Sequence, residues 1–182
     1  MTTIHFQLKN VLGLLACICI MHLSVSAQDY YFQTFSIADG LPQSQVWASL
    51  SDSRGYLWFG TQGGGLCRYD GEDFEIFTTA HGLPSNFIHS IYQESNYSIW
   101  IGTNRGLSHF DGHTFQFIEG FQEQVNVLLQ QDNYSLILGT NNGLFQLSLK
   151  DTVITKANYS AALDELEIYS LCRYKERIFV GT

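Results

Sequence analysis

The chain has 182 residues, of which 45% are hydrophobic and 14% charged, with 16 glycines and a formal net charge of -8. This hydrophobic content is too high for an intrinsically disordered chain, and the glycines and aromatics favour short strands with tight turns over helices. Lys and Arg number nine against 17 Asp and Glu, and they form no basic cluster. Such a surface repels phosphate backbones, so no nucleic acid is expected as a partner.

The first 27 residues have the pattern of a secretory signal peptide. Lys9 precedes an apolar run from Val11 to Leu23, and small residues end at Ala27, where a signal peptidase would cut. A membrane anchor is the alternative, although the 13-residue run is shorter than the roughly 20 residues that a spanning helix needs. A lipoprotein signal is a third interpretation, but Cys17 lies inside the apolar run rather than at its end. The chain after residue 27 is therefore expected to be exported.

One six-residue stretch, Tyr56–Thr61, recurs three more times and sets the phase of a repeat. Its copies are Ser98–Thr103, Ser135–Thr140 and Arg177–Thr182. Successive Gly-Thr pairs lie 42, 37 and 42 residues apart, a period that is typical of solenoids, propellers and arrays.

Each full repeat contains four short apolar runs separated by turn residues. In the first repeat the runs are 46–50, 56–61, 66–69 and 74–77. Asp70-Gly71 lies between the last two and predicts a hairpin with a type I′ turn, whose two central residues need positive φ. Four antiparallel strands in about 40 residues predict a propeller blade. An elongated stack of sheets would need a capping unit at each end, and none is visible.

The predicted fold is all-β, a β-propeller with four-stranded antiparallel blades, present as an incomplete open arc of about three and a half blades. The predicted blades are residues 43–77, 85–118 and 122–155, followed by a partial blade at 166–182. A further outer strand is predicted at 31–35, because Phe32–Phe35 aligns with Phe74–Phe77. In a closed ring such a strand would pair with the last blade and remove a free edge.

Residues 82–112 resemble the two-component regulator propeller repeat. The resemblance rests on Gly82-Leu83-Pro84, which also occurs at 40–42, and then on Trp100, Gly102-Thr103 and Asp111-Gly112 in the same order. The two later repeats match more weakly. In that family, tandem seven-bladed propellers form the extracytoplasmic sensor of bacterial hybrid histidine kinases and often take polysaccharide fragments as ligands. The resemblance implies the N-terminal part of such a sensor, since no kinase motif or second apolar span occurs.

Most repeated side chains are assigned to packing and turns. Packing between blades is expected of the residues at one strand position, which are Trp58, Trp100, Ile137 and Phe179. The Gly-Thr pair after that position is expected to let neighbouring strands approach closely. Turn or solvent roles are expected of the carboxylates Asp52, Asp70, Glu94, Asp111 and Asp132. No catalytic residue is predicted, because no partner carboxylate at a defined separation is placed by the sequence.

No metal ion or other cofactor is expected either. The histidines that follow the predicted signal are His81, His89, His109 and His113, and they lack the spacing of metal ligands. Cys67 and Cys172 lie in different repeats at non-equivalent positions, so no disulfide framework is predicted.

Candidate ligand-binding residues follow from the geometry of a propeller. The loops from an outer strand to the next inner strand share one face with the loops from second to third strand, and such loops vary without loss of fold. These loops are rich in amides, which suit hydroxyl-bearing ligands. In addition, one position early in the inner strand carries a different residue in each of the three repeats, as is expected of residues that line a central channel. The candidates are Gln43, Gln45, Trp47, Gln62, His81, Asn86, His89, Asn104, Arg105, Asn126, Asn141 and Asn142.

The expected function is therefore the N-terminal portion of an extracytoplasmic ligand-sensing propeller. Its expected partner is a small-molecule or oligosaccharide ligand, with carbohydrate favoured. The resemblance implies a homodimer in the full-length receptor, at the periplasmic face of the inner membrane and attached through downstream segments. The chain itself is not expected to be an enzyme. One alternative is a secreted propeller enzyme acting on polysaccharide, which would need a cluster of Tyr, His or Arg on the loop face. Another is a non-catalytic propeller used as an interaction scaffold.

Overall fold

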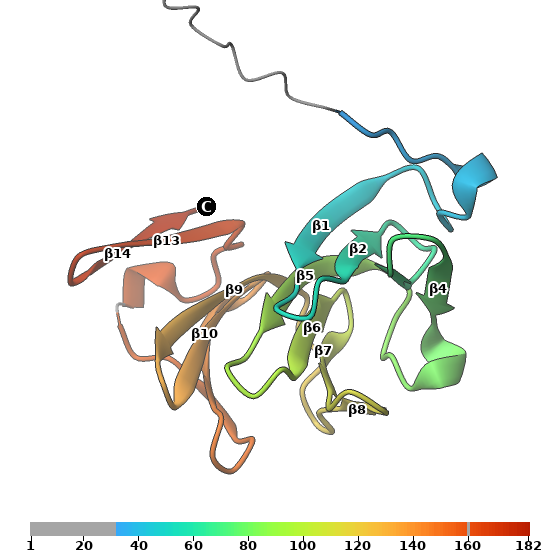
Figure 1. Ribbon diagram of the computed structural model, residues 1–182. Coiled ribbons are helices and arrows are strands. Elements are labelled where there is room, and N and C mark those ends of the chain that lie inside the picture. Colours follow the sequence, from blue (N-terminus) through green and yellow to red (C-terminus); the bar gives the residue numbers. More distant parts are fainter. Residues whose placement is uncertain (1–31, 160) are drawn as a thin grey trace, which may run out of the picture. The chain divides into compact units, whose positions relative to one another are not determined.

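A computed structural model describes residues 32–159 and 161–182 (Figure 1). Residues 35–182 form the second of two units of the chain, and the blades belong to it. The signal peptide predicted at 1–27 lies outside the described residues. Within the described part of the chain, no helix has the length and apolarity to cross a membrane.

The second unit is built from antiparallel sheets that follow one another along the chain. Three sheets have four strands each and a fourth has two, and in every sheet the strands are ordered as in the sequence. Blade 1 consists of β1 (Val46–Ser51), β2 (Leu57–Thr61), β3 (Leu66–Tyr69) and β4 (Phe74–Phe77). Blade 2 consists of β5 (Ile88–Gln93), β6 (Ile99–Thr103), β7 (Gly106–Phe110) and β8 (Phe115–Phe117). Blade 3 consists of β9 (Val125–Asp132), β10 (Ser135–Thr140), β11 (Gly143–Ser148) and β12 (Ile154–Lys156). The half-blade consists of β13 (Ser170–Tyr174) and β14 (Arg177–Gly181).

These sheets form an open arc of propeller blades, as the sequence predicted (Figure 1). The first strands lie next to one another, with β1 against β5, β5 against β9 and β9 against β13, so they form the inner edge of the arc. The connections from second to third strand and from fourth strand to the next blade lie at the same end of the sheets. We call this end the loop face; it comprises turns 62–65, 104–105 and 141–142 and linkers 78–87, 118–124 and 157–169.

Large apolar side chains pack between successive blades. Trp58 of blade 1 is fully buried, with its ring 5.6 Å from that of Phe110 of blade 2. Trp100 of blade 2 packs in the same way against Leu147 of blade 3. Ile137 is buried against the half-blade, which confirms the packing role predicted for these positions. Phe179 differs, because 55% of its surface is exposed and no described blade follows it.

The Gly-Thr pair brings neighbouring blades into close contact, as predicted. A Cβ built on Gly102 would lie 2.7 Å from the backbone oxygen of Val125, the first residue of β9 in the next blade. The threonine that follows is buried, and the Thr103 hydroxyl donates to the Gly106 carbonyl at 2.9 Å. Equivalent bonds run from Thr61 to Gly65 and from Thr140 to Gly143. The repeated motif therefore sets both the spacing between blades and the turn that follows β2, β6 and β10.

The Gly-Leu-Pro linker recurs because it ends a short 3₁₀ helix in a fixed way. Helices Ile37–Asp39 and Thr79–His81 are each preceded by a capping residue, Ser36 and Thr78 respectively. A third 3₁₀ helix, Ala161–Leu163, lies in the linker after blade 3. Gly82 then adopts a φ of 100°, which glycine accepts readily. Leu83 follows and is buried in the core between blades 1 and 2.

The outer strand predicted at 31–35 stays a prediction, because residues 32–35 have no paired strand among the described residues and the partner expected for them belongs to a closed ring. One local expectation is wrong. The Asp70-Gly71 turn is not type I′, since only Gly71 of the two has positive φ. Instead the Asp70 carboxylate accepts bonds from the backbone N–H groups of Glu72 and Asp73, which makes a four-residue connection. Asp111 closes the equivalent turn in blade 2 with bonds from His113 and Thr114.

Candidate functional site

Three of the predicted residues occupy β-bulges at the inner edge of the arc. The pairing of β1 with β2 skips Trp47, that of β5 with β6 skips His89, and that of β9 with β10 skips Asn126. A bulge residue is released from the ladder and can be aimed independently of the strand. In each of the three blades, therefore, one side chain at this edge is not constrained by the strand pairing.

The first two of these side chains form an aromatic surface. The rings of Trp47 and His89 are 4.7 Å apart and inclined by 31°, and Phe87 lies beside them with its ring 6.4 Å from that of Trp47. Trp47 remains 44% exposed and Phe87 40% exposed. Burial lowers the pKa of His89, so its ring is uncharged at neutral pH. Flat, partly exposed rings of this kind suit the apolar face of a sugar or another ring.

Asn126 and Tyr169 continue this series in blade 3 and the half-blade. The Asn126 amide donates to the backbone oxygen of Ile168 at 3.0 Å and accepts from Gln124, so it links the two blades rather than pointing to a ligand. Tyr169 precedes the pair formed by Ser170 and Gly181, as Trp47 precedes the pair formed by Ala48 and Gly60. Its ring is 59% exposed. Tyr169 was not predicted from the sequence, although its position before the last Gly-Thr pair could have indicated it.

The turn between β6 and β7 carries two predicted residues, Asn104 and Arg105. Thr103 stabilises this turn, because its hydroxyl accepts a hydrogen bond from the Arg105 N–H at 3.1 Å. The Asn104 N–H donates to the Phe87 carbonyl at 3.2 Å, which ties the turn to the preceding linker. The side-chain oxygen of Asn104 is buried and has no hydrogen-bond partner within the described part of the chain.

Two depressions adjoin at this turn. The first, of about 480 Å³, runs between linkers 78–87 and 118–124. The second, of about 300 Å³, lies beside the turn after β2. Their linings share Thr79, Pro84 and Arg105. The first is lined further by Gly82, Leu83, Phe117, Ile118, Gly120, Phe121 and Gln122, and the second by Gly63, Ser85, Asn86, Phe87 and Asn104.

The structure brings four of the predicted residues to these depressions or their margin. Asn86, Asn104 and Arg105 line them, while Gln62 pairs with Phe87 in an isolated β-bridge next to them. The Asn86 side-chain oxygen accepts from the Thr79 N–H at 2.9 Å, which fixes the linker. The apolar lining residues, such as Phe117 and Phe121, were not predicted, because the residues predicted on this face were mainly those with amide side chains.

Other predicted residues have structural partners elsewhere on the loop face. The His81 ring nitrogen accepts from the Thr78 N–H and closes a capping box, and the ring lines a separate depression with Phe77 and His113. Gln43 accepts from Ser44, and the backbone oxygen of Gln45 accepts from Gln62. In blade 3 the Asn141 side chain accepts from the Gln124 N–H and that of Asn142 donates to Glu123. These residues hold the linkers, and they are not gathered around one cavity.

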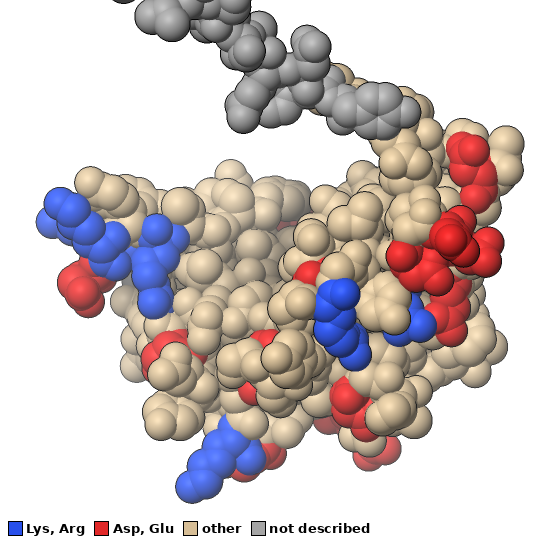
Figure 2. Space-filling view, viewed as in Figure 1, with Lys and Arg blue, Asp and Glu red and all other residues tan. Residues whose placement is uncertain are grey.

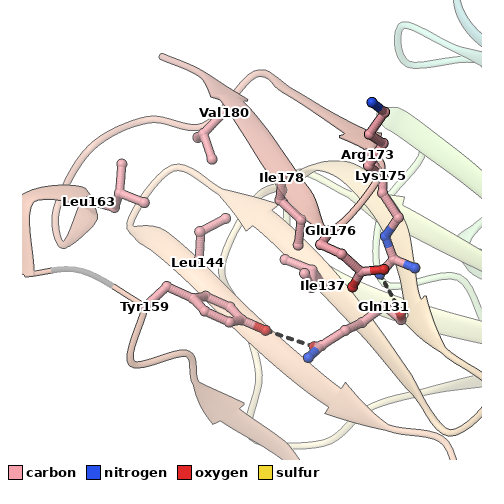
Figure 3. A pocket seen from close by; sticks show the side chains of 10 residues that line it. All are labelled: Gln131, Ile137, Leu144, Tyr159, Leu163, Arg173, Lys175, Glu176, Ile178 and Val180. Carbon is pink, nitrogen blue, oxygen red and sulfur yellow. Dashed lines mark hydrogen bonds between the residues drawn. The ribbon is translucent and has the colours of Figure 1, made fainter.

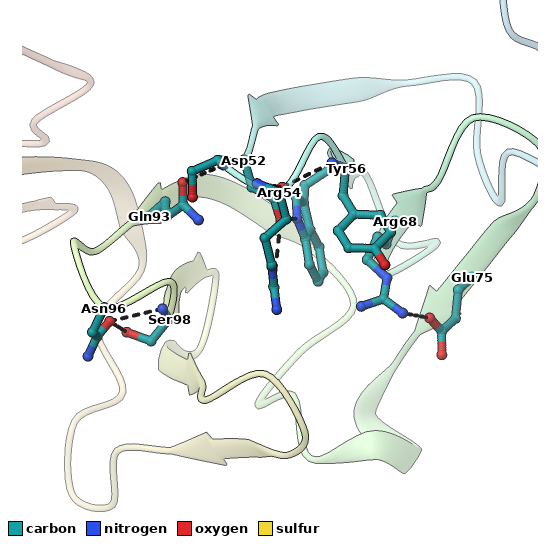
Figure 4. A network of polar contacts seen from close by, with 10 residues as sticks. Asp52, Arg54, Tyr56, Arg68, Glu75, Gln93, Asn96 and Ser98 are labelled. Carbon is teal, nitrogen blue, oxygen red and sulfur yellow. Dashed lines mark hydrogen bonds and ion pairs between the residues drawn. The ribbon is translucent and has the colours of Figure 1, made fainter.

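At the opposite end of the sheets, carboxylates accept bonds from the interblade tryptophans. Figure 4 shows one of these carboxylates, Asp52, beside Arg54 and Tyr56. The Asp52 carboxylate is buried and accepts from the indole N–H of Trp58 at 3.0 Å and from the backbone N–H groups of Arg54 and Tyr56. Burial raises the pKa of Asp52, but these bonds and the Arg54 charge outweigh it and lower the pKa overall. Glu94 accepts in the same way from Trp100 at 3.2 Å. Both carboxylates therefore belong to residues of the turn after the first strand, as expected, and the bonds from the tryptophans are a further role that was not predicted.

A depression of about 560 Å³ lies between blade 3 and the half-blade (Figure 3). Its floor is apolar and includes Ile137, Leu144 and Ile178, and its rim carries Arg173 and Glu176. Ile137 occupies the strand position of Trp58, over which Phe110 and Phe115 of the third and fourth strands of blade 2 are packed. By this equivalence the depression lies in the packing groove between two blades.

Charge is sparse and uneven on the surface. On the face in Figure 2, most of the surface is uncharged, acidic side chains gather at one end and basic side chains lie in separate small groups. Among residues 32–159 and 161–182, no three His, Cys, Asp or Glu side chains converge as metal ligands would.

The strand order and the interblade packing define the protein as a β-propeller. Within it, residues 40–63 and 82–105 match the two component regulator propeller family. Each matched segment runs from a Gly-Leu-Pro linker to the turn after Gly-Thr. This match confirms the resemblance inferred from the sequence, and the two segments carry that repeat. No protein of curated function is similar to the chain.

Solved structures show the same fold. The extracellular domain of a hybrid two component system from B. thetaiotaomicron is similar with a TM-score of 0.72 and 20% identity, over 86% of this chain and 23% of that one. A second such domain from that organism has a TM-score of 0.62 and 22% identity, over 86% and 21% of the chains. PorZ, a surface component of the type-IX secretion system of Porphyromonas gingivalis, has a TM-score of 0.64 and 14% identity, over 86% and 27%. The chain thus spans between 21% and 27% of the length of these structures.

Proposed function

We propose that the chain is part of an exported propeller that senses a carbohydrate ligand for a two-component regulator. The observation that carries the proposal is the loop face of blades 1 and 2, where Asn86, Asn104 and Arg105 line two adjoining depressions. Phe87, which lines the second depression, lies next to Trp47, and the Trp47 ring is in turn inclined against that of His89. Amides and partly exposed rings are the groups that bind sugar hydroxyls and sugar faces. The regulator propeller repeat and its extracellular structural neighbours support the sensing role.

Binding without catalysis fits the lining of the depressions. Hydrolysis of a glycosidic bond needs two carboxyl groups at a defined separation. The described residues that line the two depressions include no Asp or Glu. A bound ligand would act instead by shifting the geometry of a receptor dimer at the periplasmic face of the membrane, and it can do so only if its affinity differs between the two signalling states.

Isothermal titration calorimetry of the chain against a panel of neutral and acidic oligosaccharides tests the proposal. We expect at least one glycan to bind, and Trp47→Ala to weaken that binding by about 2- to 10-fold through loss of ring contact. Tyr134→Ala is the matched control, because Tyr134 is an exposed aromatic residue at the opposite end of blade 3. Absence of binding to every glycan, or an equal effect of the two variants, would refute the carbohydrate assignment at this face.

A further inference from the structure

We infer that the junction of the two depressions is an anion-binding subsite, and that the ligand is a saccharide carrying a carboxylate or a sulfate group. The inference rests on the proposed function and narrows its ligand class. Its centre is Arg105, whose backbone lies in the turn after β6 and whose side chain lines both depressions.

The first argument is that the Arg105 guanidinium has no counter-charge. It makes no ion pair and no side-chain hydrogen bond within the described part of the chain, whereas Arg54 pairs with Asp52 and Arg68 with Glu75. None of the described lining residues is acidic, so nothing in the lining would repel a bound anion.

The second argument is the surrounding chemistry. Pro84, Phe117 and Phe121 supply apolar surface beside the guanidinium, and low-polarity surroundings strengthen the attraction between opposite charges. The planar fork of an arginine matches a carboxylate or a sulfate with two parallel hydrogen bonds.

The third argument is the unpaired oxygen of Asn104, the residue that precedes Arg105 and lines the second depression. A buried acceptor without a partner calls for a donor, and a sugar hydroxyl next to the anionic group supplies one after a small rotation of the amide. An acidic saccharide thus offers, on one ring, the anion that Arg105 lacks and the donor that Asn104 lacks.

The test is calorimetry of the chain with two matched pairs of ligands. Trigalacturonate is compared with its neutral methyl ester, and a sulfated disaccharide with its unsulfated form, so that the two arms separate carboxylate from sulfate. We expect one acidic form to bind at least 10-fold more tightly than its neutral partner. Arg105→Gln should abolish this difference with a loss of about 10- to 100-fold, and Arg105→Lys should restore only part of it. Arg177→Gln is the control. Arg177 lies at the end of β14 that is away from the loop face, so the loss of its positive charge should leave binding unchanged.

The failures are distinguishable. If neutral glycans bind as tightly as acidic ones and Arg105→Gln binds like the parent, the anion subsite is overturned while the carbohydrate proposal stands. If inorganic sulfate binds and Arg105→Gln removes that binding, but no glycan binds, the anion subsite is supported and the carbohydrate proposal is overturned. If neither glycans nor sulfate bind, both are overturned.

Discussion

Gly102→Ala tests whether the repeated Gly-Thr pair sets the distance between blades. A methyl group at this position would lie 2.7 Å from the Val125 backbone oxygen and 2.8 Å from its Cγ1 atom. It would also lie 2.2 Å from the Ser90 hydroxyl, which itself donates to the Val125 oxygen. The hydroxyl can rotate, but a backbone carbonyl in a neighbouring strand cannot move without displacing blade 3. The substitution therefore overpacks the interface between blades 2 and 3.

Overpacking of a well-packed core typically destabilises by about 1–3 kcal/mol, and contact with backbone places this site near the upper end of that range. The reduced freedom of alanine in the unfolded chain offsets about 0.4–1 kcal/mol. We expect a net loss of about 2 kcal/mol, which lowers the melting temperature by about 4–8 °C in a chain of this size. Thermal and urea unfolding followed by circular dichroism would measure both quantities.

Gly181→Ala is the matched control. Gly181 holds the same motif position in the half-blade and also faces a serine hydroxyl, that of Ser170 at 2.3 Å, but no strand of a following blade lies behind it among the described residues. We expect its stability to change by less than about 0.5 kcal/mol, as for substitutions away from packed features. The reasoning is refuted if Gly102→Ala is as stable as the parent, or if both variants lose equal stability, since alanine would then be disfavoured by the strand itself.

Three further outcomes are expected. Because its hydrogen bonds hold the pKa of Asp52 below the ordinary value near 3.9, Asp52→Asn should be less stable than the parent at pH 6. In urea titrations at several pH values, this difference should shrink as the pH falls through the lowered pKa; a difference that does not depend on pH would contradict the role of the charge. Thr103→Val should destabilise by about 1–3 kcal/mol, because it leaves the buried Gly106 carbonyl without its side-chain donor, and it should weaken binding at Arg105 more than Thr140→Val does. Cys172 is exposed whereas burial raises the pKa of the Cys67 thiol to about 11, so peptide mapping after thiol labelling at pH 8 should find Cys172 modified in the native protein and Cys67 modified only after unfolding.

The blades and the loop face could be predicted because their signals repeat. Strands, linkers and Gly-Thr pairs recur at a nearly fixed spacing, and each copy reinforces the others. The repeat does not determine whether the outer strand at 31–35 forms, because its formation depends on a partner that no described strand supplies. The hairpin prediction failed for the Asp70-Gly71 turn, where the carboxylate closes a longer connection that competes with the tight hairpin.

The carboxylate–indole bonds were missed although the sequence holds a signal for them. Asp52 lies six residues before Trp58 and Glu94 six residues before Trp100, whereas Asp132 lies five residues before Ile137, which has no N–H to donate. In the third repeat the Asp132 carboxylate accepts instead from the Ser135 hydroxyl. The signal is the spacing itself, because in each of the first two repeats a carboxylate precedes the tryptophan by six residues.

At the bulges of the inner edge, the choice of side chain is separate from the requirements of strand pairing, although the two usually conflict in a protein. A residue inside a ladder must satisfy the register, the pleat and its cross-strand neighbours at once. Trp47 and His89 are exempt, because the pairing on either side of each proceeds without them. Asn126 is also skipped by the pairing, but its hydrogen bond to Ile168 links blade 3 to the half-blade. A substitution of Trp47 or His89 can therefore alter the proposed ligand surface and leave the strand pairing of its blade intact. In the proposed sensor, blades 1 and 2 can thus change their share of recognition separately and with little loss of stability.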